Sequence, residues 1–222
     1  MGTFGGPQIV SDGLIMHIDS ANPHSYPGSG TAINDLSGNG NNGTLTNGPT
    51  FNSSNHGSIA FDGVDEFINA PIVKTTDCTF SCWAKTTVID GSTMLFNAGP
   101  SGAGPDLYFN GNKIAWNIWN GTVNAFAKDG TPTPWPSTIR NGKYHNIVVT
   151  NDSNSTAKLY YDGVYMGETV YHTAANFTNL TIGGSSATYM WDGDISQFYV
   201  YNTALSATGI SQNFNAHKSR YI

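Results

Sequence analysis

Apolar and polar residues alternate along residues 144–201 in the way that is typical of antiparallel β-strands. Two apolar, β-branched and aromatic runs, residues 146–150 and 157–161, flank a polar turn, and a third run follows Asp162-Gly163. An Asp-Gly pair between such runs favours a type I′ turn, because both central residues need a positive φ that Gly adopts freely and Asp tolerates. The pattern therefore predicts a meander of antiparallel strands whose register is set at Asp162-Gly163.

Further short runs of the same kind are spread over the rest of the chain. They predict strands at residues 13–19, on both sides of Asp62-Gly63 within 58–70, and at 78–86, 107–109, 113–119, 123–127, 180–182 and 194–201. Residues 205–216 could form a short helix that begins at Ser206, and residues 21–49, rich in turn formers, predict a long loop. Closely spaced strands without a long helical pattern indicate an all-β, two-sheet antiparallel sandwich or jelly roll.

No linker is visible in the 222 residues, and a sandwich of this size commonly forms one domain. We therefore expect an N-terminal arm at residues 1–12 and a single domain at residues 13–222. The arm contains Gly and Pro, and it could fold back on the domain or reach a neighbouring molecule. Its apolar residues Phe4, Pro7 and Ile9 are the candidate contacts for assembly.

The composition limits the classes of partner. Charged residues make up 11% of the chain, against about 25% in an average soluble domain, so Asn, Ser, Thr and Gly must cover the surface. A net charge of -6 and only nine scattered Lys and Arg argue against nucleic acid, which requires clustered basic residues. The N-terminus lacks the pattern of a signal peptide, and no stretch is long enough to span a bilayer, so we expect a soluble protein made in a cytoplasm.

The two cysteines, Cys78 and Cys82, lie on one predicted strand. They would project from the same face, about 13 Å apart at the usual rise per residue, which is too far for a disulfide. The chain has no other Cys. Both are therefore interpreted as buried thiols rather than as redox or metal-binding groups.

Several motifs occur in a characteristic order, namely FDGVDEFI (61–68), FSCWAK (80–85), YHNIVVTND (144–152) with KLYYDGVYMGE (158–168), and IGG (182–184) followed by WDGDISQFYVYNTALSATGI (191–210). In these motifs the chain resembles the concanavalin A-like lectin/glucanase superfamily, in its laminin-G-like branch. The resemblance implies two antiparallel sheets packed face to face, one of them concave. It implies little about chemistry, since this fold carries lectins, hydrolases and purely structural modules.

A narrower resemblance lies near the two ends of the chain, in residues 6–31, 35–51 and 205–221. These segments are similar to stand-alone laminin-G-like virion proteins of tailed bacteriophages. That resemblance implies a structural subunit of the virion, such as a capsid decoration or a neck or fibre component, made in the host cytoplasm. Its partners would be capsid or other virion proteins, and closed homo-oligomers are the default for such subunits.

Catalytic patterns are missing from the sequence. Hydrolases of the superfamily use paired carboxylates on a short strand motif, whereas the chain has only Glu66 and Glu168, about a hundred positions apart. It has no Gly-x-Ser-x-Gly motif, and its six histidines show no metal-ligand spacing, which favours hydrogen-bonded structural roles. These are His17, His24, His56, His145, His172 and His217. We therefore expect a protein that is not an enzyme.

Calcium is the cofactor that the sequence makes most credible, because Ca²⁺ takes oxygen ligands that Asp- and Asn-rich loops supply. The candidate ligands are Asp35, Asp62, Asp65, Asp192 and Asp194. The resemblance suggests Asp62 or Asp194 as carriers of a calcium ion at the rim of the sandwich. The alternative is that these carboxylates cap their own turns, as Asp before Gly commonly does.

Carbohydrate binding is the alternative function, since it needs aromatic faces for stacking and amides or carboxylates for hydroxyls. Trp135 lies in a segment with three prolines, which is a poor central strand and a good exposed platform. Trp119 is the second candidate platform, with Asn117 and Asn120 beside it. Trp116 alternates with apolar residues and is predicted to be in the core. A virion subunit that also binds a glycan would satisfy both interpretations.

Overall fold

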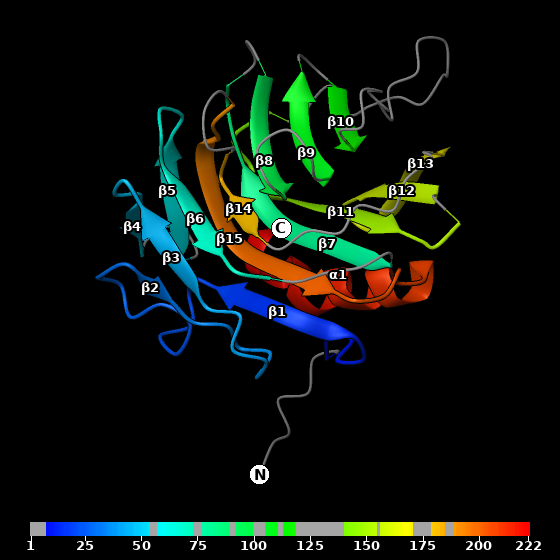
Figure 1. Cartoon of the computed structure of the whole chain (residues 1–222), viewed down its shortest axis with the longest axis horizontal. Helices are drawn as coiled ribbons and strands as arrows, with labels where there is room; N and C mark the ends of the chain where they lie inside the picture. The colour runs from blue at the N-terminus through cyan, green and yellow to red at the C-terminus, as the bar shows by residue number, and fades with distance from the viewer. Residues whose placement is uncertain are drawn as a thin grey trace.

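Two antiparallel sheets pack face to face in the computed structural model, and a C-terminal helix covers the outer face of one of them (Figure 1). The structure describes residues 8–53, 57–72, 77–88, 92–99, 105–110, 113–118, 140–154, 156–170, 179–184 and 189–222. The architecture confirms the predicted all-β sandwich with a short C-terminal helix.

Sheet A contains eight of the described strands, in the order β13-β12-β11-β7-β15-β5-β4, with β1 also paired to β15. Its strands are β1 (Leu14–Asp19), β4 (Thr50–Asn52), β5 (Ser58–Asp62), β7 (Cys78–Lys85), β11 (His145–Asn151), β12 (Thr156–Tyr161), β13 (Val164–Val170) and β15 (Asp192–Tyr201). The long strand β15 lies between β7 on one side and both β5 and β1 on the other.

Sheet B contains seven of the described strands, in the order β10-β9-β8-β14-β6-β3-β2. Its strands are β2 (Ala32–Ile33), β3 (Gly43–Thr46), β6 (Phe67–Ala70), β8 (Ser92–Ala98), β9 (Pro105–Asn110), β10 (Lys113–Ile118) and β14 (Leu180–Ile182). The pairing of β9 with β10 confirms the two strands predicted at residues 107–109 and 113–119. The strand predicted at residues 123–127 lies outside the described residues.

The meander predicted at residues 144–201 is confirmed in β11, β12 and β13, which are neighbours in sheet A. Tyr161 pairs with Val164 across the two-residue turn, and Asp162 and Gly163 have φ values of 49° and 77°. Positive φ at both positions defines a type I′ turn. A β-bulge between Leu159 and Tyr160 shifts the pairing register of β12 and β13, which the sequence pattern does not indicate.

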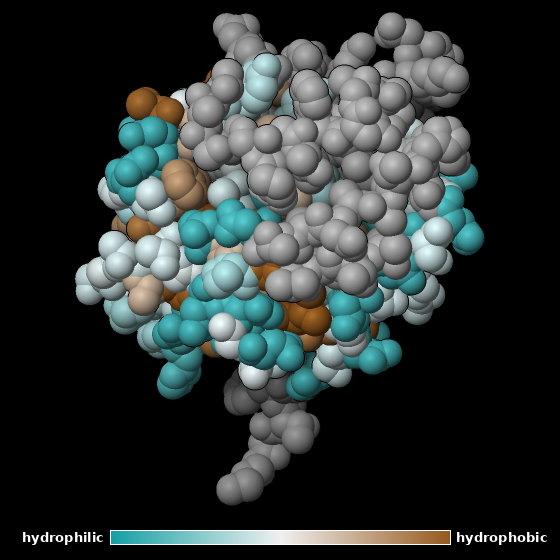
Figure 2. Space-filling view, in the orientation of Figure 1, coloured by the Kyte–Doolittle hydropathy of each residue, from teal (hydrophilic) through white to brown (hydrophobic). Residues whose placement is uncertain are grey.

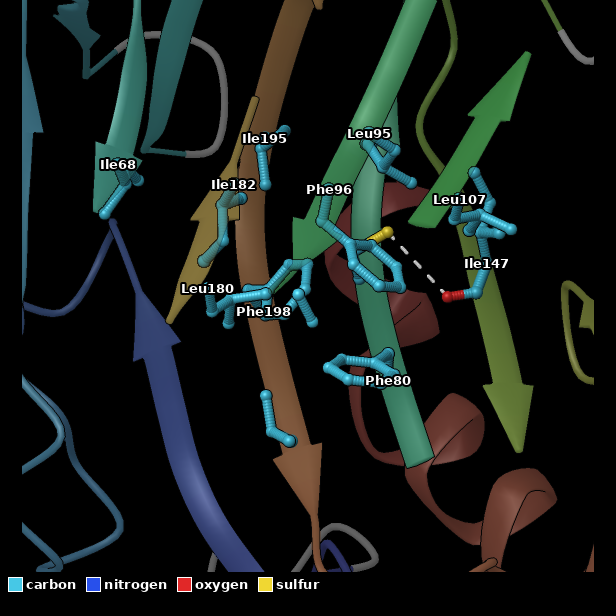
Figure 3. Close-up of a cluster of buried hydrophobic side chains, with 14 of the residues drawn as sticks. Ile68, Phe80, Leu95, Phe96, Leu107, Ile147, Leu180, Ile182, Ile195 and Phe198 are labelled. Atoms are coloured by element: carbon cyan, nitrogen blue, oxygen red, sulfur yellow. Dashed lines mark hydrogen bonds between the residues drawn. The ribbon is translucent and has the colours of Figure 1, made fainter. Parts of the chain in front are cut away.

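The core lies between the two sheets and is rich in aromatic residues. Phe96 of sheet B stacks on Phe80, with ring centroids 4.6 Å apart, and meets Phe198 edge-on at 5.4 Å (Figure 3). Cys82 donates a weak hydrogen bond to the Ile147 carbonyl, with Sγ and O 3.7 Å apart. Both cysteines are buried and unbridged, which confirms the prediction, and burial raises the pKa of the Cys82 thiol.

Two local predictions are wrong in detail. Residues 21–49 are not one continuous loop, because they contain β2 and β3 of sheet B. The strands on either side of Asp62-Gly63 exist, but β5 belongs to sheet A and β6 to sheet B. The segment between them is therefore a corner that connects the sheets, and strand composition alone does not separate such a corner from a hairpin.

Helix α1 (Ala207–Tyr221) begins after Ser206, whose Oγ accepts a hydrogen bond from the Gly209 N–H at 3.2 Å. This confirms the predicted N-cap, and the helix ends five residues later than predicted. Its aromatic residues pack on Trp83 of β7, with ring centroids 5.6 Å away for Phe214 and 4.3 Å for Tyr221. No helix in the described part of the chain is long and apolar enough to cross a membrane.

Candidate functional site

A row of polar side chains crosses the outer face of sheet B from β9 to β3. Strand register places Asp106 opposite Asn97, Asn97 opposite Thr181, Thr181 opposite Asn69, and Asn69 opposite Thr44. Residues paired in this way lie side by side on one face of a sheet. We call these five residues the polar row.

The outward direction of the polar row follows from its sequence neighbours. Leu107, Phe96, Ile182 and Ile68 belong to the buried core and point into the space between the sheets (Figure 3). Because successive side chains of a strand point to opposite faces, the residues next to them face away from the core. The five side chains therefore project from the face of sheet B that is turned away from the core.

Burial changes along the polar row. Asp106, Asn97 and Thr181 are 3%, 4% and 6% exposed, whereas Asn69 is half-buried and Thr44 is exposed. The Thr181 hydroxyl donates to the Gly184 carbonyl at 2.7 Å, which fixes its orientation. The accessible end of the row is therefore the one formed by Thr44 and Asn69.

Aromatic side chains accompany the carboxylate at the buried end of the row. Tyr108 follows Asp106 by two residues on β9, so both lie on the outer face. Burial raises the pKa of Tyr108, and the neighbouring Asp106 carboxylate and Tyr189 raise it further. Tyr189 is 45% exposed. The site thus combines a carboxylate, two amides, two hydroxyls and tyrosine rings, which are the groups that bind neutral sugars.

The glycan candidates predicted from the sequence are only partly within the described chain. Asn117 pairs with Asp106 across β10 and β9, so its backbone continues the register of the polar row. Trp135, Trp119 and Asn120 lie outside the described residues. Trp116 is fully buried in the core, which confirms the prediction made for it.

The described end of the N-terminal arm folds back on the domain. The Val10 N–H donates to Asn213 Oδ1 at 2.8 Å, and Gln212 Nε2 donates to the Gln8 carbonyl at 2.7 Å, so residues 8–10 follow helix α1. Ile9, between them, is half-buried. Phe4 and Pro7 lie outside the described residues, and their role in assembly stays a prediction.

Asp35 and Asp194, two of the calcium candidates, each contact several protein groups. The Asp35 carboxylate accepts hydrogen bonds from the backbone N–H groups of His17, Ser37 and Asn41 and from the Ser37 hydroxyl, over 2.7–3.0 Å. Asp194 accepts from the Ser58 hydroxyl at 2.7 Å and pairs with Lys85 Nζ at 3.3 Å. These contacts do not suit a calcium ligand, because the donors occupy the oxygens that the ion needs.

The other candidates gather at the corner between β5 and β6. Asp62 and Asp192 are direct partners across β5 and β15, and both are exposed. Asp62 Oδ1 also accepts from the Val64 N–H at 2.9 Å, which is the turn cap that the sequence offers as the alternative to calcium. Asp65 lies in the same corner, where its carbonyl accepts from Asn47 Nδ2 at 2.9 Å. The described residues include no group of three or more His, Cys, Asp or Glu side chains arranged to hold a metal ion. A calcium site at Asp62 and Asp192 therefore stays a prediction.

The polar row could not be found from the sequence. Each member is one residue in a short strand, and the strands are separated by up to about a hundred positions of other sequence. The sequence shows only the alternation of apolar and polar residues within single strands, as in the Phe96-Asn97-Ala98 and Leu180-Thr181-Ile182 segments. The order of the strands in sheet B, which aligns these residues, is a tertiary property.

The family profile of the Concanavalin A-like lectin/glucanases superfamily, in its laminin-G type (Laminin_G_3), matches residues 54–211. The chain belongs to this superfamily. No curated protein sequence matches the chain.

Solved structures agree with the fold. The botulinum neurotoxin type G receptor binding domain is similar with a TM-score of 0.71 and 16% identity, over 91% of this chain and 51% of that one. The binding domain of Paraclostridial Mosquitocidal Protein 1 gives 0.72 and 15%, over 93% and 53%. This superfamily chain thus spans about half the length of the toxin domains that it matches.

Domain 4 of AbnA, an extracellular arabinanase from Geobacillus stearothermophilus, was solved in complex with arabinotriose. It is similar with a TM-score of 0.69 and 16% identity, over 90% of this chain and 97% of that domain. At these identities the likeness shows the fold alone.

Proposed function

We propose that this chain is a carbohydrate-binding domain that holds a neutral glycan on the outer face of sheet B. The observation that carries the proposal is the polar row, in which Asp106, Asn97, Thr181, Asn69 and Thr44 align across five strands. Amides, carboxylates and hydroxyls exchange hydrogen bonds with sugar hydroxyls, and the row has no basic residue to favour a phosphate or an acidic polymer. Figure 2 shows hydrophilic residues over much of the visible described surface, in keeping with recognition by hydrogen bonds.

The relatives support this function. The domain of the arabinanase that resembles this chain over nearly its full length was solved with a bound arabinose oligosaccharide, and the two toxin domains are named as binding domains. All of them share the sandwich, so the fold is suited to presenting a ligand on its surface.

The described residues favour binding over hydrolysis. Glycoside hydrolysis needs two carboxyl groups about 5 to 9.5 Å apart across the scissile bond. Within the described polar row, Asp106 is the sole carboxylate. Glu66 lies at the corner before β6 and Glu168 on β13 at the far edge of sheet A, so these two cannot form a pair. We therefore propose that the polar row binds a glycan without hydrolysing it.

Binding of the purified chain to a panel of immobilised polysaccharides that includes arabinan tests the proposal. Asn69→Ala combined with Thr44→Ala removes the accessible end of the row and should weaken binding about tenfold, the sum of two hydrogen bonds of about 0.7 kcal/mol each. Thr50→Ala, at an exposed strand threonine of sheet A, is the matched control and should bind like the parent. Failure of the parent to bind any polysaccharide, or undiminished binding by the double variant, would contradict the proposal.

A structural role in the virion of a tailed bacteriophage, as a capsid decoration or a neck or fibre subunit, is the second function that we propose. The resemblance at both ends of the sequence supports it. So does a shallow, open depression beside α1, lined by Gln8, Ala207, Thr208, Ser211, Gln212 and Asn215. Its uncharged hydrogen-bonding groups suit a contact with another virion protein or with a second copy of the chain.

This role predicts a homo-oligomer made in the host cytoplasm and incorporated into particles. Ser211→Arg places a bulky charge in the depression and should prevent incorporation into phage particles while leaving polysaccharide binding unchanged. Absence of the parent chain from purified particles would refute the role.

A further inference from the structure

Two histidines flank one buried tyrosine where helix α1 meets sheet A. The His17 ring of β1 stacks on Tyr199 of β15, with centroids 4.4 Å apart and planes inclined by 20°. On α1, His217 Nε2 lies 2.8 Å from the Tyr199 hydroxyl oxygen. His217 Nδ1 lies 3.5 Å from Nε2 of Gln197, which is two residues before Tyr199 on β15. The histidine cluster, defined as His17, His217 and Tyr199, thus connects β1, β15 and α1.

An ion pair beside the cluster connects the last turn of α1 to strand β1. Arg220 Nη1 donates to both oxygens of Asp19, at 2.9 and 3.0 Å, and Gln197 Nε2 also donates to Asp19 at 2.8 Å. Arg220 Nη2 and the Tyr221 hydroxyl donate to Ser196 Oγ, at 3.0 and 2.9 Å. The Asp19 carboxylate is therefore already neutralised by Arg220.

The surroundings of the two imidazoles oppose a positive charge. The pKa of His17 is lowered to about 4, first by burial and further by His217 and Arg220, against the opposing effect of Asp19 and Asp35. Burial also lowers the pKa of His217, Arg220 lowers it further, and Asp19 opposes the shift. His17 Nε2 is buried without a hydrogen-bond partner among the described residues. Both imidazoles are thus held neutral by their environment.

We propose that the histidine cluster makes the docking of α1 sensitive to acid, so that protonation of His17 and His217 releases the helix from sheet A before the sandwich unfolds. Two new charges would lie beside Arg220, where the nearby Asp19 is already paired and Asp35 is held by its own loop. Release of the helix returns all three cations to water. It also uncovers an aromatic surface of sheet A that includes Trp83 and Tyr199.

The sign and size of the effect follow from linkage. With α1 docked, the pKa of His17 is about 4, and exposure of its ring on undocking moves that pKa up toward the ordinary value of 6.5, so the open state binds the proton more tightly. Docking is then fully stable above pH 6.5 and weakens as the pH falls toward 4. His17 alone should raise the opening constant by up to roughly a hundredfold between pH 7 and pH 4, the limit for a fully exposed imidazole. The polar row lies on the other sheet and is not affected.

Hydrogen exchange of the whole chain, measured at several pH values from 7 to 4, tests this proposal. Protection factors, which remove the intrinsic pH dependence of exchange, are compared for the amides of α1 and for those of β7 and β11. The protection of α1 should fall roughly a hundredfold toward pH 4, while that of the two strands changes much less. Equal losses in helix and strands would mean global unfolding and would overturn the proposal.

Variants separate the two histidines from other acid effects. His17→Phe keeps an aromatic ring against Tyr199, and His217→Gln keeps a hydrogen-bonding group opposite its hydroxyl, but neither residue can be protonated. The double variant should hold the protection of α1 nearly constant across the pH range. His24→Gln, at an exposed histidine, is the matched control and should behave like the parent. A double variant with the parental pH dependence would overturn the proposal.

A direct titration covers the case in which the double variant does not fold. Imidazole NMR signals of His17 and His217 in the parent protein should show midpoints well below 6.5. Midpoints near 6.5 would remove the physical basis of acid release and overturn the proposal.

Discussion

Trp83 of β7 stacks on Tyr221 in the last turn of α1, with ring centroids 4.3 Å apart and planes inclined by 18°. Tyr221 also meets Tyr144 at 5.0 Å, so one tyrosine near the end of the chain connects the helix to two aromatic residues of the sandwich. The outer face of sheet A therefore carries a cluster of packed aromatic rings, and α1 covers it.

Removal of this ring should destabilise the protein. Tyr221→Ala should lower the free energy of unfolding by about 2 kcal/mol, because a half-buried aromatic side chain loses its packing against Trp83 and Tyr144. Thermal or urea denaturation followed by circular dichroism measures the change. Tyr165→Ala, at a tyrosine that is 50% exposed, is the control and should cost less than about 1 kcal/mol. Equal effects of the two variants would contradict the packing role of Tyr221.

The turn glycine of the β12–β13 hairpin should resist substitution for two separable reasons. Gly163 has φ of 77°, and an added Cβ would lie 3.0 Å from the Phe214 ring of α1. Gly40 has φ of 76° and open space around its Cα, so Gly40→Ala measures the conformational cost alone. We expect about 1 kcal/mol for Gly40→Ala and at least about 1 kcal/mol more for Gly163→Ala. Equal costs in urea denaturation would show that the contact with Phe214 adjusts freely.

The Asp35 carboxylate should stabilise the loop between β2 and β3 by accepting its hydrogen bonds. Asp35→Ala leaves the N–H groups of His17, Ser37 and Asn41 without their acceptor and should cost about 2–3 kcal/mol. Denaturation in calcium and in chelator should give the same cost, since hydrogen bonds and not an ion hold the loop. Asp12→Ala, at an exposed aspartate, should change stability by less than about 0.5 kcal/mol. A cost for Asp35→Ala that appears only in calcium would contradict this assignment.

The paired carboxylates of Asp62 and Asp192 allow calcium binding to be tested through protein stability, without direct observation of the ion. In chelator, Asp192→Asn removes one of two like charges on directly paired residues and should raise stability by a few tenths of a kcal/mol, up to about 1 kcal/mol. In millimolar calcium the variant should be less stable than the parent if the two carboxylates share an ion. Differential scanning fluorimetry in both buffers checks the sign. The same sign in both conditions would remove calcium from this corner.

Local sequence signals predicted the elements whose causes are themselves local. The positive φ required at Asp162-Gly163 fixed the hairpin, and the Ser206 hydroxyl fixed the start of α1. Alternation along β7 likewise accounts for the opposite faces of Phe80 and Trp83. Phe80 indeed lies in the inter-sheet core, while Trp83 packs under the helix. In each case, a few adjacent residues determine the conformation.

Features that depend on distant pairing were not predictable. The corner at Asp62-Gly63 has the same composition as a hairpin, and what sends β6 to sheet B is the burial of Ile68 against partners from β3 and β14. The polar row and the histidine cluster join residues separated by tens to hundreds of positions. A single sequence carries the residue types for these sites but no information on which of them meet.

The place of β15 in sheet A has a consequence for the order of folding during synthesis. β15 pairs with β7 on one edge and with β5 and β1 on the other. Among the described strands, Leu14–Asp19 and Ser58–Asp62 therefore join the rest of the sheet only through Asp192–Tyr201. Until a ribosome has released these late residues, β5 and β7 have unsatisfied backbone edges that invite pairing with other chains. A chain that stops before Asp192 should therefore aggregate rather than fold into a smaller sandwich.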